Sequence, residues 1–383
     1  MRFEFATATR ILFGEGTVSQ VGEITASMGK SILFVTNLSE VRTTPIIEGL
    51  SKWSLRVVPF MIAGEPTVML VANGLELSNE YGCDLVLAIG GGSAIDTGKA
   101  IAALTTNHGD IYDYLEVVGK GLPVSNQPVP MIAIPTTAGT GAEVTRNAVI
   151  GVPEHRVKVS LRSPLMLPRL AIVDPELVSG LPAEITASTG LDALTQLIEP
   201  FVSLKANPLT DAICREGMRY IARSLSKAYE IEDPVARQEM SLASLFGGLA
   251  LGNSGLGTVH GFASVLGGMY PIPHGVICAR LLPCVMDTNL RALEARLPES
   301  PARSRYEEVA RILTGDPEAS AVDGIAWVQK LCTHLRVSPL SDYDITSEDI
   351  EEIIVKTGKA SSTKANPIQL TPEELRNILE SDL

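Results

Sequence analysis

The sequence predicts two domains of different class: an α/β domain built on a parallel sheet over residues 1–180, and an all-helical domain over residues 181–383. In roughly the first 175 residues, short apolar runs rich in β-branched residues alternate with helix-length segments. Such runs are typical of parallel strands covered by helices on both faces. After Asp174 and Pro175 the pattern changes to long helical periodicities with almost no strand signal. The length of 383 residues allows one large domain or two, and this change places a boundary near residues 179–182.

Five strands are expected in the α/β half. They lie at residues 32–36, 55–60, 84–89, 131–135 and 170–174. In the helical half, two segments have the sequence of a helix start: SEDI begins at Ser347 and TPEE begins at Thr371. A hydroxyl residue followed by acidic residues suits the amino end of a helix, where backbone N–H groups lack partners.

Composition excludes several classes of partner. Lys+Arg 31 against Asp+Glu 44 gives a net charge of −13, which repels nucleic-acid phosphates and anionic lipid headgroups. We therefore expect no nucleic acid and no membrane surface as a partner. The five cysteines are scattered and form no CxxC pair, so neither a disulfide framework nor a zinc knuckle is indicated. The charged N-terminus lacks a following apolar run and does not read as a signal peptide, so a cytoplasmic location is expected.

One stretch, residues 241–279, contains no Asp, Glu, Lys or Arg and is long enough to span a bilayer. Repeated glycines, Asn253, Pro271 and two histidines interrupt it. These residues favour two helices buried inside a protein over one helix in lipid.

A glycine run follows the expected strand at 84–89. Gly90, Gly91, Gly92 and Ser93 stand where that strand would lead into a helix. Glycines let backbone N–H groups approach an anion closely, Ser93 can cap the helix, and the helix N-terminus adds partial positive charge. A pyrophosphate would suit this loop. The run lacks GxGxxG spacing, so a tight turn with an ordinary cap remains an alternative.

A second loop of small polar residues follows the strand at 131–135. It reads PTTAGTG from Pro135 to Gly141. Open α/β sheets bind ligands outside the carboxyl ends of their strands, and Thr hydroxyls can bond ribose, phosphate or a carboxamide without adding charge. Two such loops indicate one cleft, although a Ser/Thr-rich turn that satisfies its own backbone is an equal alternative for this segment.

Candidate metal ligands lie in the helical half. Asp192 and Gln196 are spaced i,i+4 and would share one helix face. His260 and His274 lie in the uncharged stretch of a chain that has five histidines. A carboxylate and two imidazoles are costly to bury without a metal or another partner, so they predict a metal centre. Taken singly, each histidine also fits a hydrogen-bonded core residue.

The motifs agree with one known family in order and wording. The matching segments are FGEG from Phe13, GGGSAIDTGKA from Gly90, DYLE from Asp113, PTTAGTGAEVT from Pro135, VDPEL from Val173, LPAEITASTGLDALTQLIEP from Leu181, ANPLTDA from Ala206, LGTVHGFASVLGGMYPIPHG from Leu256 and ANPIQLTPEEL from Ala365. This series covers most of the chain and closely resembles the iron-containing (group III) alcohol dehydrogenase family.

The resemblance implies a Rossmann-like N-terminal domain that binds NAD or NADP and an all-α C-terminal domain that holds one divalent metal, usually Fe²⁺ and sometimes Zn²⁺. Dehydroquinate synthase shares this architecture, in which the substrate cleft lies between the domains. The implied pyrophosphate residues are Gly91, Gly92 and Ser93; the implied nicotinamide residues are Thr136, Thr137, Thr140 and Thr145, with Lys158 nearby; the implied metal ligands are Asp192, His260 and His274. A small-molecule alcohol or aldehyde substrate and a homodimer or larger homo-oligomer are also implied.

Three positions depart from the family pattern. Where the family has its fourth metal ligand, a His four residues after the Asp, this chain has Gln196, whose amide oxygen is a weaker ligand than imidazole. Three protein ligands and an open position remain sufficient chemically, as in the similar glycerol dehydrogenases. Ser264 replaces a further cleft His of many members. Asn37 replaces the Asp with which NAD-preferring relatives bind the adenosine ribose, so NADP is admissible.

The resemblance implies reversible hydride transfer between NAD(P)H and a small aldehyde or ketone, with the metal acting as a Lewis acid on the substrate oxygen. Asp192, His260 and His274 are therefore also the expected catalytic residues. One alternative is a non-catalytic or metal-free nucleotide-binding descendant. A dehydroquinate-synthase-like lyase is disfavoured because residues 181–204 and 241–279 contain no Lys or Arg to hold a phosphate. Cys278 and Cys284 are expected to be packing residues.

Overall fold

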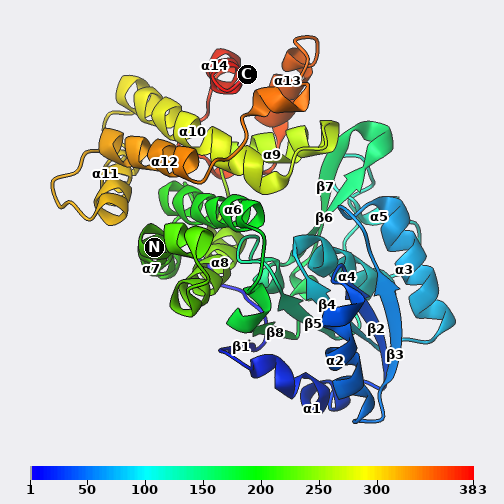
Figure 1. The fold of residues 1–383 in the computed structure, drawn as a ribbon. Helices are drawn as coiled ribbons and strands as arrows, with labels where there is room; N and C mark the ends of the chain where they lie inside the picture. Colours follow the sequence, from blue (N-terminus) through cyan, green and yellow to red (C-terminus); the bar gives the residue numbers. More distant parts are fainter. Residues whose placement is uncertain (1) are drawn as a thin grey trace. The chain divides into compact units, whose positions relative to one another are not determined.

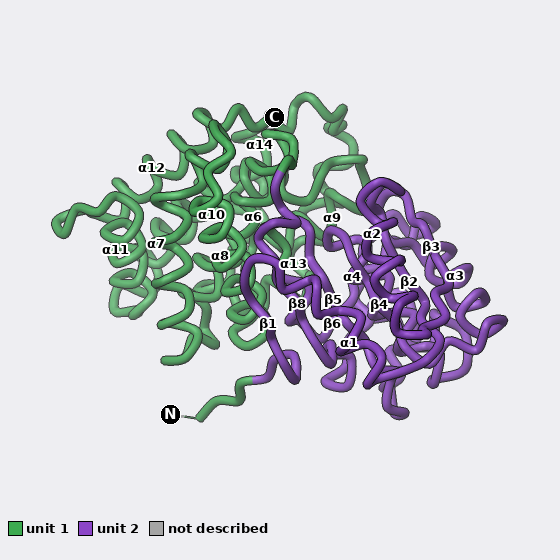
Figure 2. Tube along the Cα trace, turned by 60° about the horizontal axis from the view of Figure 1, so that its bottom comes forward, with its two compact units in different colours: residues 1–5, 138–140, 180–383 green, residues 6–137, 141–179 purple. Residues whose placement is uncertain are grey.

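The computed structural model describes residues 2–383, which form two compact units (Figure 2). One unit contains residues 6–137 and 141–179 and is called the α/β unit below. The other, called the helical unit, contains residues 180–383, the three residues Ala138–Thr140 and an N-terminal segment that ends at Phe5.

The α/β unit is built on a six-stranded sheet in the order β1-β8-β5-β4-β2-β3, with every neighbouring pair parallel (Figure 1). Its strands are β1 (Ile11–Phe13), β2 (Ser31–Thr36), β3 (Arg56–Met61), β4 (Leu85–Gly90), β5 (Met131–Pro135) and β8 (Leu170–Val173). Its helices are α1 (Val21–Ala26), α2 (Glu40–Ser51), α3 (Val68–Glu80), α4 (Gly92–Leu104) and α5 (Ile111–Tyr114). The Rossmann-like fold class and all five predicted strands are confirmed.

Side-chain alternation assigns the helices to the two faces of the sheet. On β2, Leu33 and Val35 belong to the same apolar core as residues of α3 and α4. Ile32 and Phe34, which point the other way, share a second core with residues of α1 and α2. Because a strand covered on both faces buries every residue, its sequence reads as a continuous apolar run.

Three strands of the α/β unit were not predicted. β1 is three residues long, and β6 (Asn147–Val152) and β7 (Val157–Arg162) form a separate antiparallel hairpin. In the hairpin, buried residues such as Ile150 and Leu161 alternate with partly exposed residues such as Lys158 and Ser160. A half-buried ribbon of this kind lacks the uniform apolar run by which the other strands were identified.

The helical unit contains no strand within residues 180–383. Its helices are α6 (Ala183–Val202), α7 (Pro208–Glu230), α8 (Pro234–Ser254), α9 (Thr258–Met269), α10 (His274–Arg296), α11 (Pro301–Thr314), α12 (Ala321–His334), α13 (Ile350–Lys359) and α14 (Pro372–Glu380). Thr371 caps α14 in a capping box with Glu374, as predicted. The helix expected at Ser347 begins three residues later, with Asp349 as its N-cap residue.

The uncharged stretch at 241–279 forms the second half of α8, all of α9 and the start of α10, rather than two helices. Among the residues that the structure describes, no single helix is both long and apolar enough to cross a membrane. Helices α8 and α9 reach that length and composition only as a pair, and they are bent by 101° at the break between them.

Helix α6 is the centre of the helical unit. From Thr186 to Val202 every residue except Thr189 is buried. Helices α7, α8 and α10 pack around it. Because every side of α6 is covered, the polar residues it carries are held in the interior of the unit.

Candidate metal and dinucleotide sites

The carboxyl ends of β2 and β4 mark the point where the strand order of the sheet reverses. From β2 the chain moves outward to β3, whereas β4 lies on the other side of β2 and leads on to β5. Ligands of open parallel sheets bind outside such a reversal. Asn37 follows β2 directly, and Gly91 follows β4. Two of the predicted cofactor residues therefore lie at the edge where a dinucleotide is expected.

The glycine run has the backbone that this edge requires. Gly90 has a φ of 153°, and a Cβ atom there would overlap the side chain of Asn37. Gly91 is the N-cap residue of α4, and no side chain caps the helix. Ser93 lies inside the first turn and is not the cap that the sequence analysis considered. The uncapped N–H groups of this turn are suited to an anion.

Two of the predicted threonines accompany the glycine run. The N–H of Thr136 donates to the carbonyl of Gly90 at 2.9 Å, which joins the loops after β4 and β5. Thr137 Cγ2 would lie 3.5 Å from a Cβ atom on Gly91. Thr140 belongs to the short segment that groups with the helical unit, where Gly139 packs against Thr189 of α6.

The structure places Thr145 in a buried polar cluster. Its Oγ1 accepts a hydrogen bond from Nζ of Lys99 at 2.8 Å, and Lys99 also pairs with Asp96 at 3.0 Å. Glu143 is buried nearby in sequence, and its Oε2 has no hydrogen-bond partner in the described part of the chain. Burial raises the pKa of Glu143 to about 7, against the lowering effect of the charge on Lys99.

Lys158, the remaining predicted cofactor residue, lies on the hairpin strand β7. Its Nζ pairs with Glu65 at 3.4 Å. The structure thus gathers Asn37, Gly91 and Thr137 and gives Lys158 an acidic partner of its own.

Helix α6 presents the predicted metal residues on one face. Asp192 and Gln196 are one turn apart and buried, and Glu199 follows on the same face at i+7. Glu199 was not predicted from the sequence. The i, i+4, i+7 spacing of Asp192, Gln196 and Glu199 on one face of the helix is the signal that could have found it.

The two predicted histidines meet Asp192 from two other helices. His260 lies in the first turn of α9, and its Nε2 is 3.4 Å from Asp192 Oδ1. His274 is the first residue of α10, and its Nε2 is 3.7 Å from the same oxygen. Three residues that are up to 82 positions apart in sequence therefore bring one oxygen and two nitrogens together.

Glu199 orients His260. Its Oε2 lies 2.7 Å from His260 Nδ1, and its Oε1 accepts the N–H of Val259 at 2.7 Å. A carboxylate bonded to Nδ1 holds the proton on that nitrogen and leaves Nε2 with a free lone pair, as is usual for a metal-binding imidazole. Gly257 allows this approach, because a Cβ there would lie 2.7 Å from Glu199 Oε1.

Cys278 joins the cluster, although the sequence analysis placed it among packing residues. Its Sγ lies 3.9 Å from His260 Nε2. One ligand atom each from Asp192, His260, His274 and Cys278 lies within 4.8 Å of all the others. The i,i+4 spacing of Cys278 after His274 puts both on one face of α10 and could have indicated this.

The pKa values of the cluster favour an ionised Asp192 and a positive charge beside it. Burial acts to raise the pKa of Asp192, but the charge of His274 and the nearby polar groups of His260 and Gln196 outweigh it and hold that pKa below its usual range. Burial acts to lower the pKa of His260, yet Cys278, Asp192 and Glu199 together raise it well above its ordinary value. Burial raises the pKa of the Cys278 thiol to about 12.

These residues fit a divalent metal. Asp192 Oδ1 is buried and has no hydrogen-bond partner among the described residues, although both histidines point a ring nitrogen toward it. An unpaired buried carboxylate oxygen is costly, and a cation bound to it and to both Nε2 atoms would satisfy all three.

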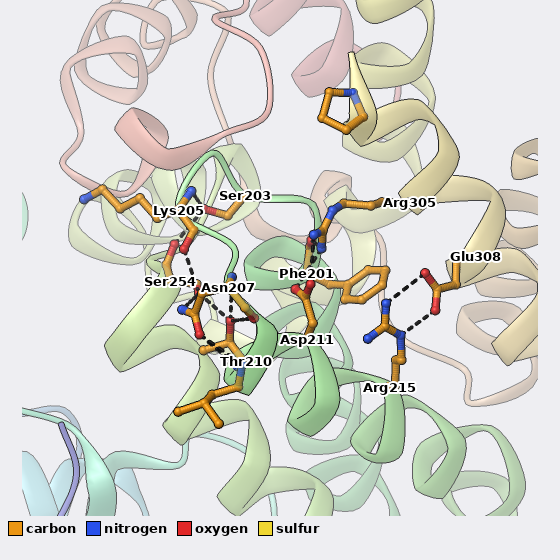
Figure 3. Close-up of polar contacts among 12 residues, drawn as sticks. Phe201, Ser203, Lys205, Asn207, Thr210, Asp211, Arg215, Ser254, Arg305 and Glu308 are labelled. Carbon is orange, nitrogen blue, oxygen red and sulfur yellow. Dashed lines mark hydrogen bonds and ion pairs between the residues drawn. The ribbon is translucent and has the colours of Figure 1, made fainter. Parts of the chain in front are cut away.

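A polar network fixes the carboxyl end of α6 (Figure 3). Nη1 of Arg305 donates to the carbonyl of Phe201 at 2.7 Å, and the same guanidinium makes two bonds of 2.8 Å to Asp211. Ser203 donates to the carbonyl of Ser254 at 2.6 Å. These bonds tie α6 to α7, α8 and α11, so the helix that carries Asp192 is anchored beyond its own packing.

Comparison with known proteins agrees with this geometry. The model described as iron-containing alcohol dehydrogenase matches residues 8–175, and the model described as Fe-containing alcohol dehydrogenase family, C-terminal, matches residues 186–383.

Individual relatives match over nearly their full length. Choline dehydrogenase of Bacillus subtilis (strain 168) is 34% identical over 96% of this chain and 91% of its own. The 1,3-propanediol dehydrogenase of Citrobacter freundii is 35% identical over 98% of this chain and 97% of its own. A crystal structure of a 1,3-propanediol oxidoreductase superposes with a TM-score of 0.92 at 32% identity and covers 100% of both chains.

This chain belongs to the iron-containing alcohol dehydrogenase family. It is accordingly an oxidoreductase that interconverts alcohols with aldehydes. The comparisons support neither of the alternatives weighed from the sequence, the non-catalytic nucleotide-binding descendant and the dehydroquinate-synthase-like lyase.

Proposed function

We propose that this protein is an NAD(P)-linked dehydrogenase of small alcohols that depends on one divalent metal held by Asp192, His260 and His274. The observation that carries the proposal is the convergence of both histidine Nε2 atoms on the buried, unpaired Oδ1 of Asp192. The donor set of one carboxylate oxygen and two imidazoles suits Fe²⁺ or Zn²⁺ and leaves room for a further ligand.

When bound, the metal supplies a Lewis acid that polarises the substrate oxygen, and the nicotinamide accepts or donates the hydride. The chain's own residues prepare this chemistry. Asp192 contributes a negative charge, Glu199 aims His260, and burial shields Asp192 and His260 from water. Excluding water strengthens the electrostatic interactions on which polarisation depends.

The dinucleotide is proposed to bind at the carboxyl ends of β2, β4 and β5. The N–H groups of Gly91, Gly92 and Ser93 would hold the pyrophosphate at the start of α4. Thr136, Thr137 and Thr140 would contribute to the nicotinamide side. Thr145 is proposed to act more remotely, because its hydroxyl is already bonded to Lys99.

Asn37 bears on the choice between NAD and NADP. It is exposed, lies beside Gly90 and brings no negative charge to the position expected for the adenosine ribose. We expect Asn37→Asp to weaken NADPH binding about 10-fold or more, because two negative charges near each other cost roughly 1 kcal/mol or more when partly desolvated. NADH binding should change less. Fluorescence titration of both cofactors measures this, and equal losses for both would show that Asn37 does not face the 2′-position.

Proton exchange with solvent is proposed to use Ser264, a cofactor ribose hydroxyl or water. Ser264 donates to the carbonyl of Gly261 at 2.9 Å, so its oxygen lone pairs remain available.

The substrate is proposed to be small and to carry no phosphate. Residues 181–204 and 241–279, which include all the proposed ligands, contain no Lys or Arg that could hold one. A homodimer or larger assembly is also proposed, and light scattering in solution would establish it.

The test is NADH and NADPH oxidation with a panel of short aldehydes and ketones. The protein is stripped of metal and resupplied anaerobically with Fe²⁺ or Zn²⁺. We expect turnover only with metal, and its loss in Asp192→Asn despite normal folding. Full activity of stripped protein, or of His260→Ala, would refute the metal site.

A further inference from the structure

The proposed metal site has three ligands from the expected residues, and the position of the family's fourth ligand is occupied by Gln196. We propose that Cys278, rather than Gln196, is the fourth ligand of this site. The inference rests on the metal site described under the proposed function and specifies its chemistry.

The candidate ligand atoms of Asp192, His260, His274 and Cys278 lie close together. Bond lengths of about 2.0 to 2.3 Å in a tetrahedral site separate neighbouring ligand atoms by roughly 3.3 to 3.8 Å. The pairs measured here are 3.4 Å from Asp192 Oδ1 to His260 Nε2, 3.7 Å from Asp192 Oδ1 to His274 Nε2, and 3.9 Å from Cys278 Sγ to His260 Nε2. All four candidate atoms lie within 4.8 Å of one another. The three measured pairs are close to this range, and the cluster is compact enough for all four atoms to reach one metal ion.

Gln196 and Cys278 differ in where their side-chain atoms lie. Gln196 follows Asp192 by one turn on the same face of α6. Its Oε1 has no partner in the described residues and faces α8, where it would lie 3.2 Å from a Cβ atom on Gly247. The oxygen of Gln196 therefore lies near α8, whereas Cys278 Sγ lies within 4.8 Å of the ligand atoms of Asp192, His260 and His274.

Helix α10 brings Cys278 to the site together with His274. His274 and Cys278 are one turn apart on the same face of α10. Gly275 lets α10 approach α6 closely, because any Cβ there would overlap the backbone carbonyl of Ser188. The close approach brings both side chains of this face to Asp192.

The ligand chemistry has a consequence for the choice of metal. A bound Cys278 gives up its proton to solvent as the metal binds, and the thiolate and Asp192 together neutralise a dication. A neutral set of charges suits this site, because Asp192, His260 and Cys278 are buried and an unbalanced buried charge is costly. Thiolate is a soft ligand that favours zinc over iron. We therefore expect this protein to prefer Zn²⁺ to Fe²⁺ more strongly than a site with oxygen and nitrogen ligands alone.

The test uses Co²⁺ as a spectroscopic probe in the full-length protein. Stripped protein is titrated with Co²⁺ under anaerobic conditions, and absorbance and bound metal are measured together. A thiolate ligand produces a charge-transfer band in the near ultraviolet, which nitrogen and oxygen ligands do not. We expect the band at one equivalent of metal. Its absence with one Co²⁺ bound would overturn the proposal.

Variants assign the band. We expect Cys278→Ser to abolish the charge-transfer band and to weaken Zn²⁺ binding by about 100-fold or more. Loss of a residue that only supports a ligand weakens metal binding by at most about 100-fold. If Cys278→Ser does not fold, Cys278→Ala is used instead to remove the sulfur. The matched control is Cys284→Ser on the same helix, whose sulfur accepts a hydrogen bond from Ser381 and which should keep both band and affinity. Persistence of the band in Cys278→Ser would refute the assignment.

Gln196→Ala separates the two candidate ligands. We expect it to keep the band and to lose less than about 10-fold in affinity, as for a residue that orients a ligand. A loss as large as that of Asp192→Asn, with Cys278→Ser unaffected, would make Gln196 the ligand. If the unmodified protein binds no Co²⁺ or Zn²⁺ at all, the metal site itself fails, and with it the proposed function. Metal binding without a band refutes the role of Cys278 alone.

Discussion

Glu199 shows how one side chain prepares another for chemistry. It accepts hydrogen bonds from His260 Nδ1 and from the N–H of Val259, each at 2.7 Å. Both oxygens are thus engaged, and the imidazole ring is fixed with Nε2 toward Asp192. Glu199 does not join the proposed ligand set, so it is a positioning residue.

We expect Glu199→Gln to weaken metal binding by about 10- to 100-fold, as for other residues that orient a metal-binding histidine. An amide has a single acceptor oxygen, so one of the two hydrogen bonds must be lost. Metal affinity is measured by competition with a chelator. Glu184→Gln, at an exposed position near the start of the same helix, is the control and should leave affinity unchanged. Wild-type affinity in Glu199→Gln would show that packing alone orients His260.

Glu143 is a buried carboxyl in the α/β unit with one oxygen unpaired. Its pKa is raised by burial from about 4.5 to about 7. Between these two values the folded protein keeps the proton that the unfolded chain has released. Raising the pH from 4.5 to 7 therefore favours unfolding, and above pH 7 the effect is constant.

We expect Glu143→Gln to remove this pH dependence. Relative to wild type, the variant should gain unfolding free energy between pH 5 and pH 8, by up to about 3 kcal/mol for the full shift. Urea unfolding at the two pH values measures the difference. The exposed Glu15→Gln should show no such gain. Parallel pH profiles for Glu143→Gln and wild type would mean that Glu143 ionises normally in the folded protein.

At the scale of elements, the contact between α6 and α10 determines the geometry of the proposed metal site. His274 and Cys278 reach Asp192 because α10 begins directly against the backbone of α6. Gly275 is the residue at this contact. A side chain there would push the start of α10 outward, because a backbone carbonyl cannot rotate away as the end of a long side chain can.

We expect Gly275→Ala to destabilise the protein by about 1 to 3 kcal/mol and to lower metal affinity more than stability alone explains. Gly252→Ala on α8 is the matched control, since a Cβ atom there meets nothing within 4 Å. The control should be neutral or stabilise by up to about 1 kcal/mol, because alanine favours helix. Thermal unfolding and metal competition test both variants. Unchanged metal affinity in Gly275→Ala would show that α10 tolerates the shift.

At the scale of the whole molecule, the metal and the dinucleotide are proposed to bind to different units. The proposed metal ligands all lie in the helical unit, and the pyrophosphate loop lies in the α/β unit. A ligand stabilises the folded state that binds it by about 2.7 kcal/mol at 100 times its dissociation constant. Each ligand should therefore protect mainly the unit that binds it.

Hydrogen exchange of backbone amides measures this protection directly. We expect metal to slow exchange in α6, α9 and α10, and dinucleotide to slow exchange at the start of α4. Slowing of the same segments by both ligands would instead mean that the two units unfold as one. No protection of α6 by metal would contradict the proposed ligands.

Much of the fold was predictable because its chemistry is local. Strands β2, β4 and β5 are buried on both faces, so their sequences read as apolar runs, and Thr371 caps α14 through atoms three residues apart. β1 and the β6–β7 hairpin were missed because a three-residue strand and a half-exposed ribbon leave little local signal. Within the site, His260 and His274 stood out because polar residues in an uncharged segment need a partner.

By itself, the sequence determined the family to which the chain belongs, and it supplied the residues proposed to carry the chemistry: the acid, the imidazoles and the glycine run. Only the tertiary structure decided which of these side chains meet. Glu199 and Cys278 are ordinary residues in the sequence, whereas Gln196 is a candidate ligand there. The roles proposed for these three residues, a positioning residue, a ligand and a non-ligand, depend on how α6, α9 and α10 face one another. That orientation comes from packing between residues far apart in sequence, which no local pattern of residues records.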